Sequence, residues 1–417
     1  MKYLILLISL VLSSSVLQAQ VEEMPPPENI RTIIFNSGGN QSQLPIIRLG
    51  EPIFLTFDDL NANEEDYYYR ITHHDFDWKE SNLAKGEFME GYDDVRIRTY
   101  DNSLNSLQLY AHYRLSIPNQ ETRRLTKSGN YMISIYMDTG QLIFSRKFMV
   151  IEQGAGVAVD VKRARDFNFI NTKQVVQFTI KPGAEFIANP KQTVNTLVIQ
   201  NYNLKTAITD LKPQYTIGQE LIYRYDIEAG FWGGNEYLNF DSKDLRGANI
   251  GVSRIEVTDL YNHFLFTNPS RADQPYTFNP DINGNFVVRT LNAVQSVGFE
   301  AEYIWMHFRL QYFEELDGKE IHIYGNFNNF NLDDTTKLSY DPTDNVYKGV
   351  RKFKQGFYNY KYVLLDRDGS IDSGAVGGNF WETENDYTVL VYYREPGGRF
   401  DRIIGYGKGN SNNITNN

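Results

Sequence analysis

The sequence contains no cysteine, and this absence excludes two common ways of securing an exported protein. Without cysteine the chain can form no disulfide bond, and it can carry no lipid attached through an acylated cysteine. At 417 residues the chain exceeds the size at which single hydrophobic cores stop growing. We therefore expect several domains, each stabilised by its own buried core.

Other features that would point to particular functions are also missing or scarce. The chain holds only six histidines, and no Gly-x-Ser-x-Gly or His-Glu-x-x-His motif accompanies them. Basic residues form no run of five, and 41 Lys and Arg face 52 Asp and Glu, so the net charge is −11. This charge argues against nucleic acid as a partner. Beyond the N-terminal segment no apolar run approaches the ~18 residues that a membrane-spanning helix needs.

The N-terminal segment has the pattern of a secretory signal peptide. Lys2 precedes an apolar stretch from Tyr3 to Leu12, which is followed by three serines and by Leu17-Gln18-Ala19. This order of a basic residue, an apolar core and a small-residue cleavage site predicts export with cleavage before Gln20. We expect the mature protein to work in a bacterial envelope.

The composition that remains favours β-strands over helices. The chain holds 29 Tyr and 26 Phe, and aromatic and branched side chains suit a pleated, half-buried surface. Ile53, Leu55 and Phe57 alternate with other residues and should share one face. The stretches 131–137 and 142–151, separated by Asp138-Thr139-Gly140, predict a hairpin in which the glycine adopts a positive φ.

Many short strands separated by turn residues predict an all-β chain of tandem immunoglobulin-like or early-set β-sandwiches. We expect an N-terminal sandwich over 20–154, a central sandwich with long loops over 155–295, and a C-terminal early-set sandwich over 296–406. The polar stretch 407–417 is predicted to be disordered, and the free protein to be a monomer. A membrane β-barrel is an alternative, but short polar segments such as 202–215 argue against it.

Three polar clusters are candidates for metal binding. His73, Asp75 and Asp77 alternate along one predicted strand and would bring an imidazole and two carboxylates together. Residues 59–65 and 281–285 have the Asp and Asn spacing of calcium loops, but the first has Glu64 where such loops need glycine. We interpret the three clusters as a solvated strand face and two polar turns. The sequence predicts no metal, no cofactor and no catalytic residues.

An aromatic block at 231–237, Phe-Trp-Gly-Gly-Asn-Glu-Tyr, is the most distinctive part of the chain. Aromatic side chains beside a flexible glycine pair often belong to binding surfaces, although a tryptophan packed under a loop would give the same pattern. The residues that we expect to contact a protein partner are Phe231, Trp232, Tyr237, Arg271 and Tyr276.

The stretch 223–286, together with 54–60, 103–113 and 129–131, resembles the plug proteins of the type IX secretion system of Bacteroidetes. The resemblance extends over essentially the whole mature chain. It implies a non-enzymatic periplasmic protein that reversibly closes the periplasmic opening of the outer-membrane translocon barrel. Attachment to the outer membrane would then depend on that protein partner and not on a membrane span of its own.

The C-terminal region resembles a second family. Residues 321–330 and 356–363 are similar to early-set immunoglobulin-like modules that bind α-glucans. Such modules place a tryptophan where Phe330 stands, so Phe330 and Trp381 are candidates for a vestigial sugar platform. An envelope polysaccharide-binding protein or a glycan-active enzyme is therefore the alternative function. A cell-surface adhesin is a third reading, although the Asn-rich ending does not resemble a sorting domain.

Overall fold

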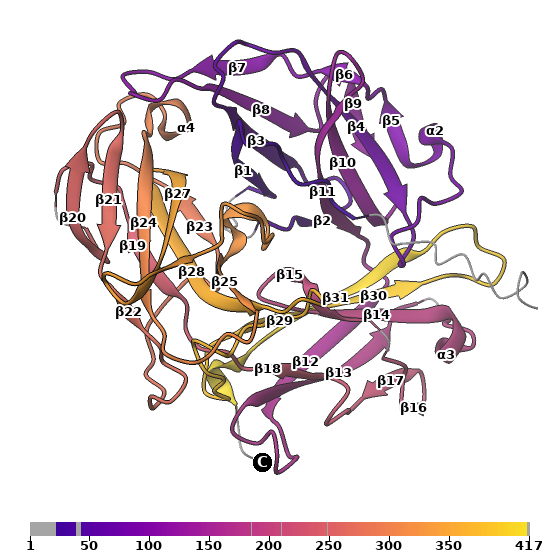
Figure 1. Cartoon of the computed structure of the whole chain (residues 1–417). Helices are drawn as coiled ribbons and strands as arrows, with labels where there is room; N and C mark the ends of the chain where they lie inside the picture. The colour runs from indigo at the N-terminus through magenta and orange to yellow at the C-terminus, as the bar shows by residue number, and fades with distance from the viewer. Residues whose placement is uncertain (1–21, 39–42, 185, 210, 248, 415–417) are drawn as a thin grey trace, which may run out of the picture.

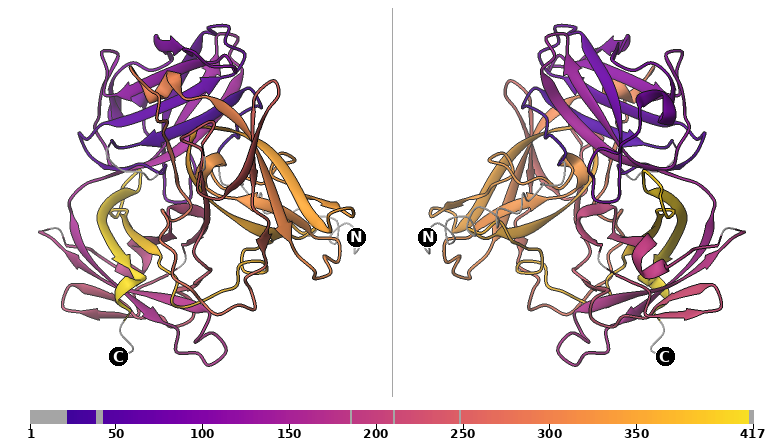
Figure 2. Two further views of the ribbon diagram at one scale, coloured as in Figure 1. Left: turned by 90° about the vertical axis from the view of Figure 1, so that its left-hand side faces the viewer. Right: turned by 90° about the vertical axis from the view of Figure 1, so that its right-hand side faces the viewer.

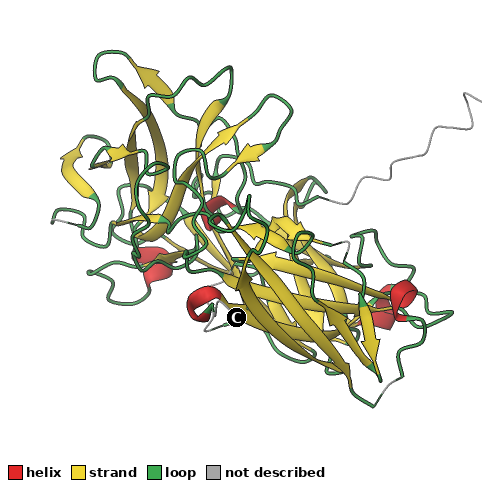
Figure 3. Ribbon diagram, turned by 90° about the horizontal axis from the view of Figure 1, so that it is seen from below, coloured by secondary structure: helices red, strands yellow, loops and turns green. Residues whose placement is uncertain are grey.

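The computed structural model describes residues 22–38, 43–184, 186–209, 211–247 and 249–414. The predicted signal peptide, 1–19, lies outside the described residues. Strands dominate what is described, as Figure 3 shows. The helices are single turns: α2 (Lys85–Phe88), α3 (Pro190–Thr193), α4 (Val297–Glu300) and the 3₁₀ segments η1 (Asn326–Asn328) and η2 (Ser411–Asn413). In these residues no helix has the length and apolar character required to cross a bilayer.

The first sandwich is formed by strands β1 to β11. One sheet has the order β1-β3-β8-β7, the facing sheet has the order β2-β11-β10-β4-β6, and β5 pairs with β9 at the side. Its strands are β1 (Ile30–Asn36), β2 (Ile46–Arg48), β3 (Ile53–Asp59), β4 (Tyr67–His74), β5 (Met89–Gly91), β6 (Val95–Arg96), β7 (Thr99–Asn102), β8 (Ala111–Ile117), β9 (Thr122–Leu125), β10 (Gly129–Met137) and β11 (Leu142–Ile151). Ile53, Leu55 and Phe57 all point into the core between the sheets, which confirms the alternation expected for β3.

The predicted hairpin is confirmed. Strands β10 and β11 pair antiparallel from Gly129 opposite Val150 to Tyr136 opposite Leu142. The turn closes with a hydrogen bond of 2.9 Å from the Gly140 amide to the Met137 carbonyl, and Gly140 has a φ of 82°. This positive φ is why the sequence needs glycine there.

The middle domain is one large sheet that curls over its own core. Its order is β15-β14-β30-β31-β12-β13-β17-β16, with β18 also paired to β13. The strands are β12 (Ala155–Arg163), β13 (Lys173–Pro182), β14 (Val194–Gln200), β15 (Asn203–Ile208), β16 (Tyr215–Ile217), β17 (Glu220–Tyr223), β18 (Gly230–Trp232), β30 (Asp386–Tyr393) and β31 (Arg402–Asn410). Its core joins Val176 and Phe178 of β13 with Val389 and Val391 of β30, so the two halves of the sheet face each other.

The third domain is a sandwich built around the long strand β28. One sheet has β28 at its centre, paired with β19, β23, β25 and β29, and the other has the order β20-β21-β24-β27-β26 with β22 beside β24. The strands are β19 (Leu238–Asp241), β20 (Val252–Val257), β21 (Tyr261–Leu265), β22 (Asn268–Pro269), β23 (Phe286–Val288), β24 (Tyr303–Gln311), β25 (Glu320–Tyr324), β26 (Ser339–Asp341), β27 (Val346–Lys354), β28 (Gly356–Leu365) and β29 (Ile371–Asp372). Tyr358, Tyr360 and Tyr362 of β28 are buried in the core between these sheets.

The sheets divide the chain differently from the predicted domain borders. The third sandwich begins at β19, well before residue 296, and the chain then returns to the middle domain through β30 and β31. Residues 407–410 belong to β31, so this part of the predicted disordered tail is ordered. Pairing between strands about 200 residues apart leaves no local mark in the sequence, which is why the expected borders followed chain order.

The three domains contact one another in a triangle. Figure 1 shows the first sandwich at the top, the third at the left and the middle domain below, and Figure 2 shows the C-terminal hairpin running between the first and middle domains. A mixed apolar cluster joins Trp78 and Met149 of the first sandwich to Leu390, Tyr392 and Ile403 of that hairpin. The end of the chain therefore fastens the middle domain to the first.

Candidate functional site

A cavity of about 380 Å³ lies where the middle and third domains meet. Strands β14, β15 and β18 contribute one wall, and Tyr324 of β25 and Lys361 of β28 contribute the other. On β28 the residues Tyr360 and Tyr362 face the sandwich core, so Lys361 points outward, towards the middle domain. This volume lies within the usual range of small-molecule sites.

Three of the five predicted partner-contact residues line this cavity. They are Phe231, Trp232 and Tyr237, but only Trp232 has a largely exposed side chain, at 47%, against 4% for Phe231 and 5% for Tyr237. The Trp232 ring packs against Phe169 and lies under the Lys173 ammonium at 4.4 Å. Phe231 packs in the core of the middle domain against Tyr387, so of the three rings only that of Trp232 is open to a partner.

The glycine pair of the aromatic block is required by close backbone packing. A Cβ on Gly233 would lie 2.0 Å from the Phe380 carbonyl oxygen, and Gly234 has a φ of 67°. The Gly234 carbonyl accepts a 2.8 Å hydrogen bond from the Phe380 amide. The chain passes between the middle and third domains once at this glycine pair and once near Phe380, and the absence of side chains at the pair lets these two segments pack closely.

Behind Tyr237 lies a polar network centred on the buried carboxylate of Glu236. Glu236 accepts hydrogen bonds from the Tyr276 hydroxyl at 2.5 Å and the Glu384 amide at 3.1 Å, while Arg271 donates to the Glu236 carbonyl at 2.8 Å. Burial raises the pKa of Glu236. Arg271 and Tyr276, both predicted to contact a partner, are half-buried members of this internal network.

Asp281 extends the same network towards the cavity. Its carboxylate accepts hydrogen bonds from the backbone amides of Tyr237 and Asn283. Burial raises the pKa of Asp281 to about 7, against the lowering effect of those two amides. The predicted calcium-like turn at 281–285 is therefore a structural turn that directs its first carboxylate inward.

The two residues of the predicted sugar platform do not line the cavity. Phe330 is only 2% exposed and packs against Tyr324, with the ring centroids 5.1 Å apart. Trp381 is half-buried, and the Arg163 guanidinium lies 4.5 Å from its ring centroid. Phe330 thus has no open face on which a sugar could stack.

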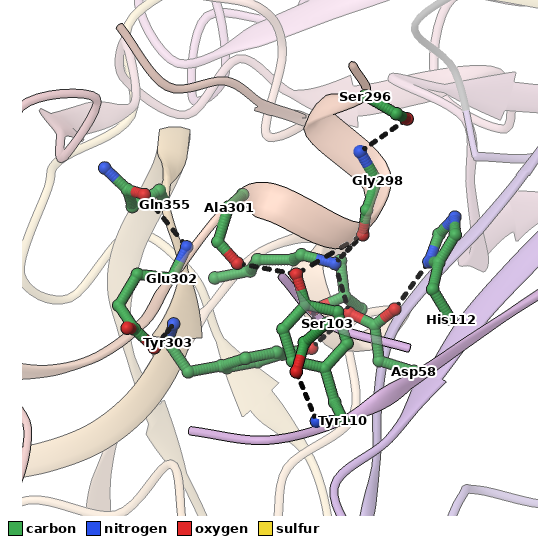
Figure 4. Close-up of polar contacts among 12 residues, drawn as sticks. Asp58, Ser103, Tyr110, His112, Ser296, Gly298, Ala301, Glu302, Tyr303 and Gln355 are labelled. Carbon is green, nitrogen blue, oxygen red and sulfur yellow. Dashed lines mark hydrogen bonds and ion pairs between the residues drawn. The ribbon is translucent and has the colours of Figure 1, made fainter. Parts of the chain in front are cut away.

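A second buried cluster joins the first and third sandwiches, and Figure 4 shows it. Asp58 of β3 and His112 of β8 are opposite each other in one sheet, and Tyr303 of β24 and Lys354 of β27 are opposite each other in the other. The Asp58 carboxylate lies 2.6 Å from each of three donors, His112 Nδ1, the Tyr303 hydroxyl and Lys354 Nζ.

Lys354 and Asp58 form an ion pair that is closed to solvent, with side chains 1% and 0% exposed. Burial alone would raise the pKa of Asp58, but Lys354 and His112 hold it below its usual value. The ammonium also donates to the Gly298 carbonyl and lies 4.1 Å from the ring centroid of Tyr110. A buried pair with this many hydrogen bonds fixes how the two sandwiches meet.

Glu302 adds a second polar tie at this junction. Its carboxylate accepts hydrogen bonds from the amides of Leu107 at 2.5 Å and Gln108 at 3.2 Å, in the loop between β7 and β8 of the first sandwich. Gln355 in turn accepts from the Glu302 amide at 2.9 Å. Glu302 thus links the first sandwich to the strand pair β24–β27 of the third.

The first and middle domains meet around Asp401, at the start of β31. The Phe76 amide donates to the Asp401 carboxylate at 3.0 Å, and the Asp401 amide donates to Asp75 at 2.9 Å. Arg394 lies 2.8 Å from both carboxylates. Asp75, which the sequence placed in a candidate metal cluster, thus pairs with an arginine from the C-terminal hairpin.

His73, the other main member of that candidate cluster, is buried. Its Nε2 donates to the Ser128 carbonyl at 3.1 Å, and its Nδ1 accepts from the Ser81 hydroxyl at 2.8 Å. Among the residues that the structure describes, no group of three His, Asp or Glu side chains is arranged to hold a metal ion. Burial lowers the pKa of His73 to about 4.

Comparison with protein families links the first sandwich to a known group. Residues 30–152 match the model of the type 9 secretion system plug protein 1st domain. The match begins at the first residue of β1 and ends one residue after β11, so it covers the first sandwich from end to end. The expected relation to the plug family is thereby supported for this part of the chain.

The whole fold recurs in a solved structure. A crystal structure at 2.30 Å resolution of a hypothetical protein from Parabacteroides merdae ATCC 43184 superposes with a TM-score of 0.89. The two sequences are 29% identical, and the match covers 94% of this chain and 100% of the other. No curated protein matches this chain. The assignment of the C-terminal region to the early-set type stays a prediction.

Proposed function

We propose that this protein, whose first sandwich matches the plug family, is a periplasmic, non-enzymatic plug of the type IX secretion system. In this role it reversibly occludes the periplasmic opening of the outer-membrane translocon barrel when no substrate is passing. The observation that carries the proposal is the end-to-end match of the first sandwich, together with a fold shared over the whole chain.

The packing of the three domains supports a role as a rigid stopper. A plug must keep its shape against a pore wide enough for folded cargo, although the chain has no disulfide to stiffen it. The buried Asp58–Lys354 pair ties the third domain to the first sandwich, and the Arg394–Asp75 pair ties the middle domain to it. Bodies whose interface backbone moves little on binding can dock and leave repeatedly without refolding.

The surface is suited to a reversible interface. The net charge is −11, and the surface also exposes large apolar side chains, a mixture found in non-obligate complexes. A contact that seals a wide opening should bury more than ~2,000 Å². Within the aromatic block, Trp232 is the residue proposed to reach the partner directly, because its ring is exposed at the surface.

Deletion of the gene tests the proposal. In cells that keep the translocon barrel intact, the outer membrane should become permeable to large solutes, and the wild-type gene should restore the barrier. Purification of the barrel in detergent should recover the protein. Unchanged permeability in the deletion strain, with the barrel present, would contradict the proposed function.

A point variant refines the test. Trp232→Ala should reduce recovery of the protein with the barrel while leaving its unfolding midpoint unchanged. Tyr215→Ala, which removes another largely exposed ring from the short strand β16, is the matched control and should leave recovery unchanged.

A further inference from the structure

Lys361 stands out among the residues that line the cavity between the middle and third domains. Its Nζ lies 4.7 Å from the ring centroid of Tyr237 and 5.9 Å from that of Tyr324, and both rings line the cavity. Throughout the described ranges, no hydrogen-bond acceptor or carboxylate is paired with this ammonium. Lys361 is half-buried, so its ammonium is partly screened from bulk water and can hydrogen-bond a ligand in the cavity.

No nearby carboxylate accepts a hydrogen bond from the Lys361 ammonium in the part of the chain that the structure describes. Asp281 is close enough to influence Lys361, but its carboxylate is already held by the amides of Tyr237 and Asn283. Burial lowers the pKa of Lys361 to about 8, while Asp281 opposes the shift. At pH 7 the amine is therefore still mainly protonated, and none of its three N–H groups has a hydrogen-bond acceptor among the described residues.

The other cation in the cavity is already engaged. Lys205 Nζ donates to the Phe330 carbonyl at 3.1 Å and to the Asn331 side chain at 2.6 Å. No arginine lines the cavity, so it lacks the forked donor set typical of phosphate sites. The site thus offers one free positive charge, and the carboxyl of Asp281 behind it disfavours a ligand with several negative charges.

The walls define the rest of the ligand. Trp232, Tyr237 and Tyr324 supply aromatic surface, and the exposed Trp232 ring lies at the edge that faces solvent. The carboxamides beside them are already committed: Asn203 donates to the Tyr324 hydroxyl at 2.8 Å, and Gln200 donates to the Trp232 carbonyl at 3.0 Å. An apolar, flat molecular body fits such walls better than a polyhydroxylated one.

We infer that this cavity binds a small organic monocarboxylate, with the carboxylate accepting hydrogen bonds from Lys361 Nζ and an aromatic body lying between Trp232 and the two tyrosine rings. The inference does not depend on the proposed plugging role. It gives a role to a half-buried ammonium group that lines the cavity without a hydrogen-bond partner from the described residues.

Isothermal titration at pH 7 with benzoate and phenylacetate, and with neutral benzamide as the comparison ligand, tests this site. We expect saturable binding of at least one carboxylate to the full chain, and binding weaker by at least about tenfold in Lys361→Met, as for loss of a charge-assisted hydrogen bond. Benzamide should bind the two proteins equally. Lys361→Arg, which keeps the charge, should retain part of the affinity.

The matched control is Lys352→Met. Lys352 also places its ammonium over an aromatic ring, 4.9 Å from the centroid of Trp305, but it does not line this cavity. This variant should bind the carboxylates as the wild type does. Absence of saturable binding of both carboxylates, or equal binding by Lys361→Met, would overturn the inference.

Stability provides an independent readout. Because partial burial disfavours the charged form of Lys361, Lys361→Met should unfold at the same or a higher temperature than the wild type. If Lys361 serves ligand binding, Lys361→Met should bind carboxylates more weakly and be at least as stable as the wild type. A variant that both unfolds earlier and loses binding would show that Lys361 is a structural residue, and would refute the site.

Discussion

Replacing Lys354 by methionine should loosen the junction between the first and third sandwiches. Methionine retains most of the apolar stem of lysine but leaves the Asp58 carboxylate, at 0% exposure, without its ammonium partner. Removing one member of a buried pair typically costs about 3–5 kcal/mol. We expect the lower end, about 3 kcal/mol, because His112 Nδ1 and the Tyr303 hydroxyl still contact Asp58.

Urea unfolding of Lys354→Met at pH 7.5 measures this cost, followed by intrinsic fluorescence and by near-ultraviolet circular dichroism. Three packed domains can unfold in steps, so a new early transition is an equally informative result. The double variant Asp58→Asn with Lys354→Met should cost less than the sum of the two single variants, with a coupling of about 0.5–3 kcal/mol.

An exposed pair serves as the control. Lys319 and Asp366 are 3.6 Å apart, with side chains 36% and 42% exposed, so Lys319→Met should change the free energy of unfolding by no more than about 0.5 kcal/mol. If Lys354→Met costs less than about 1 kcal/mol, the buried pair does not hold the junction and the reasoning fails.

Three further predictions concern other parts of the chain. Burial lowers the pKa of His73 to about 4, so between pH 6.5 and pH 4 the unfolded state takes up a proton that the folded state does not. Up to about 3 kcal/mol of stability should be lost over that range. His73→Gln should lose less stability over the same range, and an equal loss would contradict the pKa assigned to His73. The pKa of Lys361, lowered to about 8, predicts a change of stability at alkaline pH. From pH 8 to 9.5 the folded state releases a proton before the unfolded state does, so the stability of the wild type should rise relative to that of Lys361→Met. A constant difference in stability would contradict this prediction. Gly233→Ala should lower the free energy of unfolding by about 1–3 kcal/mol in thermal or urea unfolding, because its Cβ would meet the Phe380 carbonyl oxygen. The control Gly156→Ala, whose Cβ would have its nearest neighbour 3.9 Å away, should be nearly neutral. Equal effects of the two variants would show that the backbone at Gly233 can shift to accept a side chain.

Local pattern predicted the local structure well. The alternation of Ile53, Leu55 and Phe57 identified the inward face of β3, and Gly140 identified the turn of the β10–β11 hairpin. Both depend on interactions within a few residues, where periodicity and turn chemistry act directly.

Candidate sites were predicted less completely, for a physical reason. Six residues of the block 231–237 line the cavity, although the sequence predicted this block to contact a protein partner. Lys361, the ammonium group of the proposed ligand site, comes from a strand more than 120 positions later. Only strand register places it beside Tyr237 and Tyr324. One signal was available: Lys361 is the one charged residue within the aromatic run 357–362.

The sequence by itself determined that the chain is all-β, that no disulfide holds it together, and which short segments pair as neighbours, because composition and two-residue periodicity are local properties. Tertiary structure decided the rest. Asp58, His112, Tyr303 and Lys354 lie up to 296 positions apart, yet two strand pairings and one domain contact bring them within hydrogen-bonding distance. The return of β30 and β31 to the middle domain was decided in the same way, since long-range pairing depends on burial that only the assembled fold provides.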